Sequence, residues 1–419
     1  MMGPFSRRRF LASVAAASTT SGLVSLAPQV PWFLADSAAL GAQAGATGEK
    51  ILVVVQLSGG NDGLNTVIPF RDERYIKARP SLKFDENSVL KIDADTGFHP
   101  SLKGLTKLLE AQQLSIVQGV GYPNPNRSHF ESMDIWHTAR NEVGGDRTAG
   151  WIGRGLDSRQ EDWNRTPDPG ALHLGEEVQP LALLARAVPV PSIRSLEQFQ
   201  LDLGGNFRLR QSIESAAGAS RSDASELLKF VQTRTTSALE VSRRIEATAK
   251  DYKTPVVYPE TGLAHKLKQA AQLIDAGLST RVYYVALDGF DTHSQQADAH
   301  SGLLLQLGDA LAAFAEDLQT HGHLERVTTL VFSEFGRRLA ENASQGTDHG
   351  AAAPVFLVGS KVKAGLVGKH PSTAELDDGD VKFAIDFRAI YSALLTQWLN
   401  WPAAAILGGE FQPAEVLKA

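Results

Sequence analysis

The 419-residue chain is 43% hydrophobic and 21% charged, with a formal net charge of −6 at pH 7. These values are typical of a globular protein and argue against a disordered or collagen-like chain. The chain contains no cysteine, which excludes disulfides, zinc–thiolate sites and a cysteine nucleophile and suits an oxidising compartment.

The N-terminal stretch SRRRFLASVAAASTTSGLVSLA resembles a twin-arginine export signal, because three arginines at 7–9 precede a mildly apolar, Ala-rich run. Ser, Thr and Gly interrupt this run, so it is too weak for a membrane span, which needs about 20 predominantly apolar residues. Small residues favour cleavage near Ala42 or Ala44. We therefore predict that 1–44 is a signal recognised by the twin-arginine machinery. A cytosolic basic N-terminus is the less favoured alternative.

This signal predicts a periplasmic or extracellular protein without a transmembrane segment in its mature form. Cleavage after Ala44 would remove three Arg and one Asp and change the formal charge from −6 to −8. A chain of this acidity is a poor nucleic-acid binder, so we expect no nucleic-acid partner.

Short apolar runs alternate with amphipathic helical patterns, which predicts an α/β fold with a mostly parallel central sheet. The predicted strands are 51–57, 114–120, 281–287, 327–332 and 354–359, and the predicted helices are 223–249, 262–276, 297–320 and 386–399. The strand runs are continuously apolar, so we expect helices on both faces of the sheet. The pattern weakens over 140–222, which predicts a loop-rich insertion in a single domain spanning 45–419.

Polar clusters follow four of these strands. They lie at 59–65, 123–129, 288–293 and 333–337. In open α/β sheets ligands bind beyond the carboxyl ends of the strands, so parallel strands would place all four clusters at one edge.

The cluster LDGFDTHS contains Asp288, Asp291 and His293 within six residues. Carboxylates and imidazoles are common ligands of zinc, manganese and iron. The alternative is a turn in which the two carboxylates cap the backbone. Three such groups in one loop favour a metal site.

Other clusters are less specific when each is taken alone. Asp62 in LSGGNDGLNT and the pair Asp348–His349 are typical of turns. Glu334 in FSEFGRRL is equally a metal ligand or an ion-pair partner of the arginines that follow it. These clusters gain meaning only from their shared position at strand ends.

Ser128 in NPNRSHFESMDIWHTA begins a helical pattern, and Glu131 follows three residues later as in a capping box. A helix start favours an anion, so Ser128 could attack a phosphoryl or sulfuryl group bound there. Arg127 and His129 would help to hold that anion. For a single serine, a cap is otherwise the better interpretation.

Taken in order, these clusters resemble the DUF1501 family of exported bacterial proteins of uncharacterised function. The likeness rests on motifs such as VVVQLSGGNDGLNTVIPF, NRSHFESMDIWHTA, LDGFDTHSQQ, LVFSEFGRR and TDHGAAAPVFLVG, and it covers nearly the whole mature chain. More distantly, the layout is similar to the alkaline phosphatase superfamily, especially its phosphopentomutase and phosphoglycerate mutase branch. That resemblance implies a three-layer α/β/α sandwich and two metal ions with a Ser or Thr nucleophile between them.

The resemblance implies five ligands for divalent ions. They are Asp288, His293 and His349 for one ion, and Asp62 and Glu334 for the other. Phe335 stands where the second site needs an imidazole, which would weaken that site or leave it to a hard ion such as magnesium or calcium. Asp348 or Asp291 would be a substitute ligand. Zinc, manganese, magnesium and calcium all remain open.

The resemblance also implies Ser128 as the nucleophile or as the residue that positions an activated water. Arg127 and Arg337 would stabilise developing charge. The expected function is an exported metal-dependent hydrolase acting on a small anionic phosphate or sulfate ester. A formylglycine mechanism is excluded, because the chain has neither Cys nor Ser-x-Pro-x-Arg.

Two alternatives stay open. The first is a non-enzymatic exported binding or assembly protein with a decayed metal site, which Phe335 favours. The second is a structural calcium site built from Asp62, Asp288 and Asp291.

Overall fold

The computed structural model describes residues 49–142, 145, 147–166, 168–194 and 252–418. The predicted signal at 1–44 and the predicted helix at 223–249 lie outside the described residues. None of the helices in the described part of the chain has the length and apolarity that a membrane span requires.

A nine-stranded sheet forms the centre of the described chain, in the order β13-β5-β12-β9-β1-β8-β6-β7, with β16 paired to β5. The strands of this sheet are β1 (Ile51–Ser58), β5 (Leu114–Gly121), β6 (Ala171–Leu174), β7 (Ser192–Ile193), β8 (Val282–Asp288), β9 (Val327–Ser333), β12 (Ala353–Val358), β13 (Gly365–Val367) and β16 (Ile385–Asp386). All neighbouring pairs are parallel except those of β12, which is antiparallel to both β5 and β9. The prediction of a mostly parallel sheet is confirmed.

The direction of β12 decides which residues reach the edge of the sheet where ligands are expected. β1, β5, β8 and β9 all end at this edge, whereas β12 begins there. The residues that precede β12 therefore meet the residues that follow the other four strands. This edge is called the carboxyl edge below.

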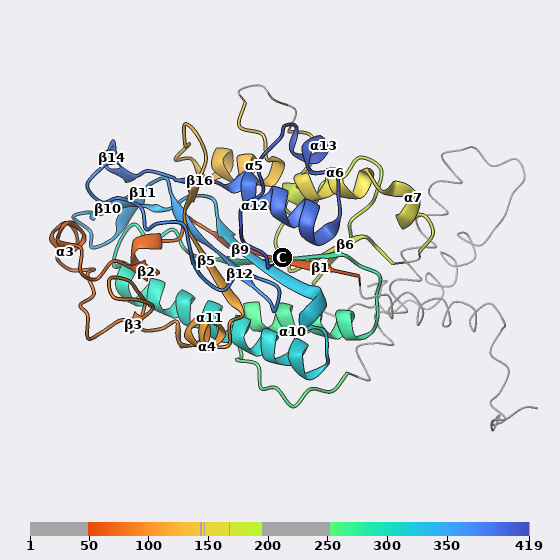
Figure 1. The fold of residues 1–419 in the computed structure, drawn as a ribbon, viewed down its shortest axis with the longest axis horizontal. Coiled ribbons are helices and arrows are strands. Elements are labelled where there is room, and N and C mark those ends of the chain that lie inside the picture. Colours follow the sequence, from red (N-terminus) through yellow and green to blue (C-terminus); the bar gives the residue numbers. More distant parts are fainter. Residues whose placement is uncertain (1–48, 143–144, 146, 167, 195–251, 419) are drawn as a thin grey trace, which may run out of the picture. The chain divides into compact units, whose positions relative to one another are not determined.

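Helices cover both faces of the sheet (Figure 1). One face carries α4 (Lys103–Glu110), α10 (Gly262–Asp275) and α11 (Gln296–Thr320), and the other carries α5 (His129–Thr138), α6 (Trp151–Asp157), α12 (Phe387–Ala393) and α13 (Ala403–Leu407). Successive side chains of β1 point to opposite faces, as in any strand. Val53 and Val55 pack in the hydrophobic core on the face of α4, α10 and α11. Leu52 and Val54 pack in the core on the opposite face. The predicted three-layer α/β/α sandwich is thereby confirmed.

The predicted helices 262–276 and 297–320 correspond to α10 and α11. The predicted helix 386–399 is α12 followed by a π-helical segment, η4 (Leu394–Leu399). The region predicted as an insertion contains α6, α7 (Gln160–Trp163), β6, the 3₁₀ turn η2 (Leu181–Leu183) and β7. Its last part, 195–222, lies outside the described residues.

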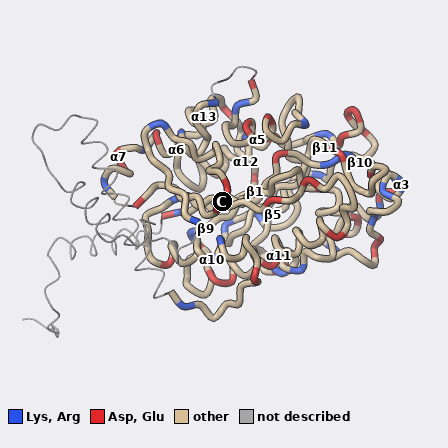
Figure 2. The backbone as a smooth tube through the Cα atoms, turned by 180° about the vertical axis from the view of Figure 1, so that it is seen from behind, with Lys and Arg blue, Asp and Glu red and all other residues tan. Residues whose placement is uncertain are grey.

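Smaller elements surround the carboxyl edge. They are η1 (Gly63–Asn65), β2 (Val67–Ile68), α3 (Glu73–Ala78), β3 (Leu90–Lys91), β4 (Gly97–Phe98), β10 (Arg337–Glu341), β11 (Thr347–His349), β14 (Leu376–Asp377) and β15 (Asp380–Val381), while η3 (Leu324–Arg326) precedes β9. Acidic and basic positions lie close together around β10 and β11 (Figure 2). Arg338, for example, forms ion pairs with Asp378 and Asp380.

Candidate metal centre

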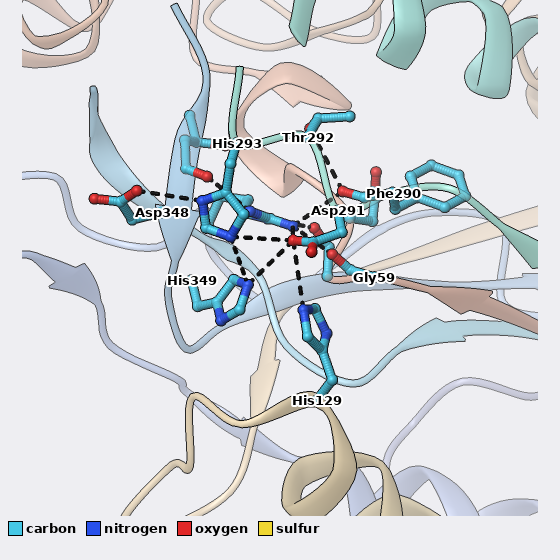
Figure 3. A network of polar contacts seen from close by, with 12 residues as sticks. Gly59, His129, Phe290, Asp291, Thr292, His293, Asp348 and His349 are labelled. Carbon is cyan, nitrogen blue, oxygen red and sulfur yellow. Dashed lines mark hydrogen bonds and ion pairs between the residues drawn. The ribbon is translucent and has the colours of Figure 1, made fainter. Parts of the chain in front are cut away.

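Three imidazoles converge on one carboxylate at the carboxyl edge (Figure 3). The Nε2 atoms of His293 and His349 each lie 3.1 Å from Asp291 Oδ1, and His129 Nε2 lies 3.4 Å from the same oxygen. His129 is the first residue of α5, and Asp291 and His293 lie in the loop after β8. His349 ends β11 just before β12. These four residues are called the metal centre below.

The other ring nitrogen of each imidazole faces an oxygen atom. The partners of the three Nδ1 atoms are Glu334 Oε1 for His129 at 2.8 Å, the Arg127 carbonyl for His349 at 2.7 Å and Asp348 Oδ1 for His293 at 3.4 Å. When Nδ1 donates its hydrogen to such an acceptor, Nε2 presents a lone pair. Histidines that bind metals are held in this way by an outer shell of acceptors.

The donor atoms of His129, Asp291 and His349 lie within 4.8 Å of one another, a spacing that would suit a single divalent ion. His293 Nε2 and His349 Nε2 lie 2.9 Å apart, so their lone pairs repel each other unless a proton or a cation lies between them. His129 Nε2 is shielded from solvent and has no hydrogen-bond partner among the described residues. Three imidazole nitrogens and one carboxylate oxygen form a donor set that zinc and related transition metals accept.

Asp291 is suited to bind a cation, because its carboxyl group is negatively charged. Burial would raise the pKa of this carboxyl group, but the hydrogen bond from Arg337, the neighbouring His349 and the charge of Arg337 lower the pKa to about 2. The hydrogen bond with Glu334 raises the pKa of His129, whereas burial lowers the pKa of His349. Asp291 is therefore ionised across the physiological range, and a metal at His129 has to compete with a proton.

Arg337 joins the loops that carry the metal centre. Its guanidinium is buried and donates to the carbonyl oxygens of Gly60 at 2.7 Å, Thr347 at 2.7 Å and Phe290 at 3.0 Å, and to Asp291 Oδ1 at 2.8 Å. The sequence interpretation gave Arg337 a role in stabilising charge on the substrate. The structure places it behind Asp291, where backbone carbonyls occupy most of its donors.

Glu334 lies beside the metal centre and is only 2% exposed. Besides contacting His129, its carboxylate accepts hydrogen bonds from the Gly59 N–H at 2.8 Å and the Ser333 hydroxyl at 3.0 Å. Gly59 has φ +116°, and a Cβ there would lie 2.4 Å from the Asp291 backbone nitrogen. The loop after β1 therefore approaches the backbone of Asp291 closely. The Glu334 carboxylate contacts His129 at Nδ1, the ring nitrogen that points away from Asp291.

Asp62 belongs to a separate buried network. Its two oxygens accept hydrogen bonds from Arg79 at 2.5 and 3.0 Å and from Gln296 at 2.5 Å. Burial would raise the pKa of Asp62, but the charge and hydrogen bonds of Arg79 bring the pKa below its ordinary value. The structure does not bring Asp62 together with the metal centre, because these partners already occupy its carboxylate.

Three further predicted residues lie around the metal centre. Ser128 is the exposed N-cap residue of α5, but its hydroxyl makes no capping hydrogen bond within the described chain. Glu131 pairs with Arg147 instead, so the predicted capping box does not form. The Arg127 guanidinium pairs with Asp378 and Asp380, and only its carbonyl contacts His349.

An open cavity of about 570 Å³ adjoins the metal centre. Its lining includes His129, Asp291 and Glu334, together with the predicted ligand Asp288 and the hydroxyl-bearing Ser58. Ser58 ends β1, and its Oγ accepts a hydrogen bond from Gln56 Nε2 at 2.9 Å, so its own hydrogen can be donated into the cavity. The sequence analysis missed Ser58, although its position at a strand end was a usable signal.

The buried side chains behind Ser58 lead to a pH-dependent prediction. His137 Nε2 lies 2.8 Å from Gln56 Oε1 and 3.2 Å from the Tyr284 hydroxyl, and burial lowers the pKa of His137 to about 3. Neutral His137 is thus favoured in the folded state. Its contribution to stability is complete above the unfolded pKa near 6.5 and is lost as the pH falls toward 3.

We expect the free energy of unfolding of chelator-treated protein to fall less steeply with acidification in His137→Gln than in the wild type. One proton taken up on unfolding changes the free energy of unfolding by about 1.4 kcal/mol per pH unit. Urea unfolding at several pH values between 3 and 6.5 measures this difference. Equal slopes for the two proteins would contradict the prediction.

The sequence matches a family described as "Protein of unknown function (DUF1501)" over residues 49–397, which is most of the chain. The chain belongs to the DUF1501 family. All four residues of the metal centre lie within the part that matches DUF1501. A search of the curated proteins finds no match.

The DUF1501 chain is also similar to several solved structures. The PsFucS1 sulfatase from Pseudoalteromonas sp. is 12% identical with a TM-score of 0.37, over 91% of this chain and 72% of that one. A protein in the alkaline phosphatase superfamily from Vibrio parahaemolyticus is 9% identical with a TM-score of 0.41, over 86% and 69%. Murine ectonucleotide pyrophosphatase/phosphodiesterase 5 is 8% identical with a TM-score of 0.39, over 85% and 96%. These similarities are too distant to assign an activity to the DUF1501 chain.

Proposed function

We propose that this DUF1501 protein is an exported metal-dependent hydrolase of phosphate or sulfate esters, with one divalent ion held by the metal centre. The observation that carries the proposal is the convergence of three imidazole Nε2 atoms on Asp291 beside an open cavity. Each imidazole is fixed by an acceptor at Nδ1. Such an arrangement prepares ligands before the ion arrives.

The donor set favours zinc or manganese over magnesium or calcium. Magnesium and calcium prefer oxygen ligands, whereas three of the four donors here are imidazole nitrogens. When bound, the ion would supply Lewis acidity toward an ester oxygen and toward an attacking water. Asp62 has a structural role in this proposal, because its partners are Arg79 and Gln296.

The protein groups around the cavity have separate tasks. Glu334 holds the proton at His129 Nδ1, and Arg337 fixes the orientation of Asp291. The Ser58 hydroxyl lines the cavity and can donate a hydrogen bond to an ester oxygen. We assign substrate contact to Ser58 rather than to Ser128 because Ser58 lines the cavity.

The test combines metal analysis with hydrolysis. Protein purified without chelator is expected to contain about one zinc or manganese ion per chain and to hydrolyse an aryl phosphate or an aryl sulfate. Dialysis against a chelator should abolish the hydrolysis, and the same metal should restore it. Metal-replete protein that hydrolyses neither ester would contradict the proposal.

Phe335 supports a second candidate function, a metal-binding protein without hydrolytic activity. Its ring packs against the rings of His129 and His349, with centroid distances of 5.0 and 4.8 Å. An apolar ring therefore fills a position where a second ion would need ligands. Stoichiometric metal without any ester hydrolysis would favour this candidate.

Glu334 offers a prediction that does not depend on activity. We expect Glu334→Gln to weaken metal affinity by about 10–100-fold, because outer-shell carboxylates orient and charge the ligating imidazole. Competition with a fluorescent zinc chelator measures the change. The matched control is Glu325→Gln, since Glu325 is paired with Lys361 away from the metal centre. Equal affinity in both variants would contradict the role of Glu334.

A further inference from the structure

Two strongly exposed apolar side chains lie beside the metal centre. Phe130 is 87% exposed and Val178 is 92% exposed, and both line the cavity that reaches Asp291. Phe130 directly follows the ligand His129 in α5, and Val178 lies in the loop between β6 and η2. Apolar side chains in this position gain burial when an apolar group enters the cavity.

The remainder of the lining extends this apolar character. Met133, Pro180 and Leu181 also line the cavity. Its volume of about 570 Å³ is within the range of about 300–1,000 Å³ that is typical of small-molecule sites. The space is therefore large enough for an apolar group in addition to an ester at the metal centre.

Charges around the cavity act against a substrate with several negative charges. Asp134, Glu177 and Asp288 line it together with Asp291 and Glu334. Lys266, which lies next to Glu177, is paired with that residue at 2.6 Å. Each further negative charge on a substrate is repelled by these carboxylates, whereas a single charge directed at the metal centre is not penalised to the same extent.

We propose that the substrate is a monoanionic ester of an apolar alcohol, with the apolar group seated against Phe130 and Val178. This inference rests on the proposed hydrolase function. A sulfate monoester and a phosphodiester share the required chemistry, because each carries one negative charge on a tetrahedral centre. Hydrolysis breaks the bond from sulfur or phosphorus to the alcohol oxygen. Water supplies the hydroxyl group that stays on the acid and the proton that the departing alcohol takes.

The kinetic test uses three p-nitrophenyl esters with metal-loaded protein. We expect p-nitrophenyl sulfate or bis(p-nitrophenyl) phosphate to exceed the dianionic p-nitrophenyl phosphate at least tenfold in kcat/KM. The comparison between the two monoanions distinguishes a sulfate ester from a phosphodiester. Phe130→Ala should lower kcat/KM for the preferred ester by about tenfold, mainly through KM, because about that much affinity follows from burying an aromatic ring.

Two further variants serve as controls. Phe130→Leu should keep most of the activity, since it restores apolar contact. Val257→Ala should change nothing, because Val257 is 89% exposed but does not line this cavity. Metal content is expected to be the same in all these variants, so a loss of activity cannot be assigned to a loss of the ion.

Binding of sulfonates distinguishes a failure of this inference from a failure of the proposed hydrolase function. Calorimetry should show that benzenesulfonate binds the metal-loaded protein at least tenfold more tightly than methanesulfonate, and that Phe130→Ala removes this preference. If aryl esters are hydrolysed but Phe130→Ala behaves like Val257→Ala, or the dianion is preferred, this inference is overturned and the proposed hydrolase stands. If no ester is hydrolysed, the hydrolase proposal fails, and the sulfonate preference alone then reports on the apolar site.

A second copy of the chain is the competing occupant of this surface. In that case Phe130→Ala would change the oligomeric state seen by sedimentation velocity and would leave the affinity for benzenesulfonate unchanged. That outcome would overturn the inference.

Discussion

Replacing His349 with alanine is expected to remove the metal from the protein. The variant loses one of three imidazole donors and leaves the Nε2 atom of His293 without its neighbour at 2.9 Å. Inductively coupled plasma mass spectrometry after dialysis should detect well under one ion per chain, and ester hydrolysis should fall to background. His129→Ala should give the same result, because His129 contributes another imidazole donor, which Glu334 holds in place.

The control for this prediction is His265→Ala. His265 has a 59% exposed side chain and pairs with Glu260, away from the metal centre. The control should retain its metal and its melting temperature. In the wild type, metal at about 100 times its dissociation constant should add about 2.7 kcal/mol to the free energy of unfolding, and His349→Ala should lose this increment. Full metal occupancy in both His349→Ala and His129→Ala would show that these residues do not bind the ion.

Replacing Asp62 with alanine is expected to lower the free energy of unfolding by about 3–5 kcal/mol, because it leaves a buried charge without its partner. Asp62 and Arg79 both have fully buried side chains. Urea unfolding measures the loss, and the double variant Asp62→Ala/Arg79→Met should recover much of it because no buried charge remains. The metal content of Asp62→Ala is expected to stay unchanged.

The pH dependence of this ion pair follows from the pKa of Asp62, which lies below its ordinary value. A carboxyl group of this kind stabilises the fold above its unfolded pKa, and the stabilisation is lost as the pH falls through its folded pKa. Asp62→Ala should therefore differ most from the wild type near neutral pH. Loss of metal with unchanged stability in Asp62→Ala would instead identify Asp62 as a ligand.

The sequence predicted the long elements of the fold because they carry strong periodic signals. The run 51–57 and the helical stripe over 297–320 correspond to β1 and α11 almost residue for residue. β6 and β7 contain only four and two residues, which is too short for a period to appear. Their place in the sheet depends on the pairing of β6 with β8 and of β7 with β6, and the contact with β8 is a long-range one that local patterns do not contain.

The candidate site was partly predictable for the same reason. A strand end pointed to the loop of His293, and the resemblance pointed to His349. The structure brings both residues to the metal centre. His129 was interpreted as an anion-binding neighbour of Ser128, since nothing local shows that Glu334 holds its Nδ1. Local sequence also could not separate Asp288 from Asp291, because the loop conformation depends on distant Gly59 and Arg337.

The ligands of the metal centre are far apart along the chain. His129 and His349 are separated by more than half of its length, and His349 lies opposite Arg337 in the pairing of β10 with β11. During synthesis, the full set of donors exists only after residue 349 has been added and the antiparallel β12 has joined the sheet. The proposed ion would therefore find all of its donors together only after residue 349 has joined the fold.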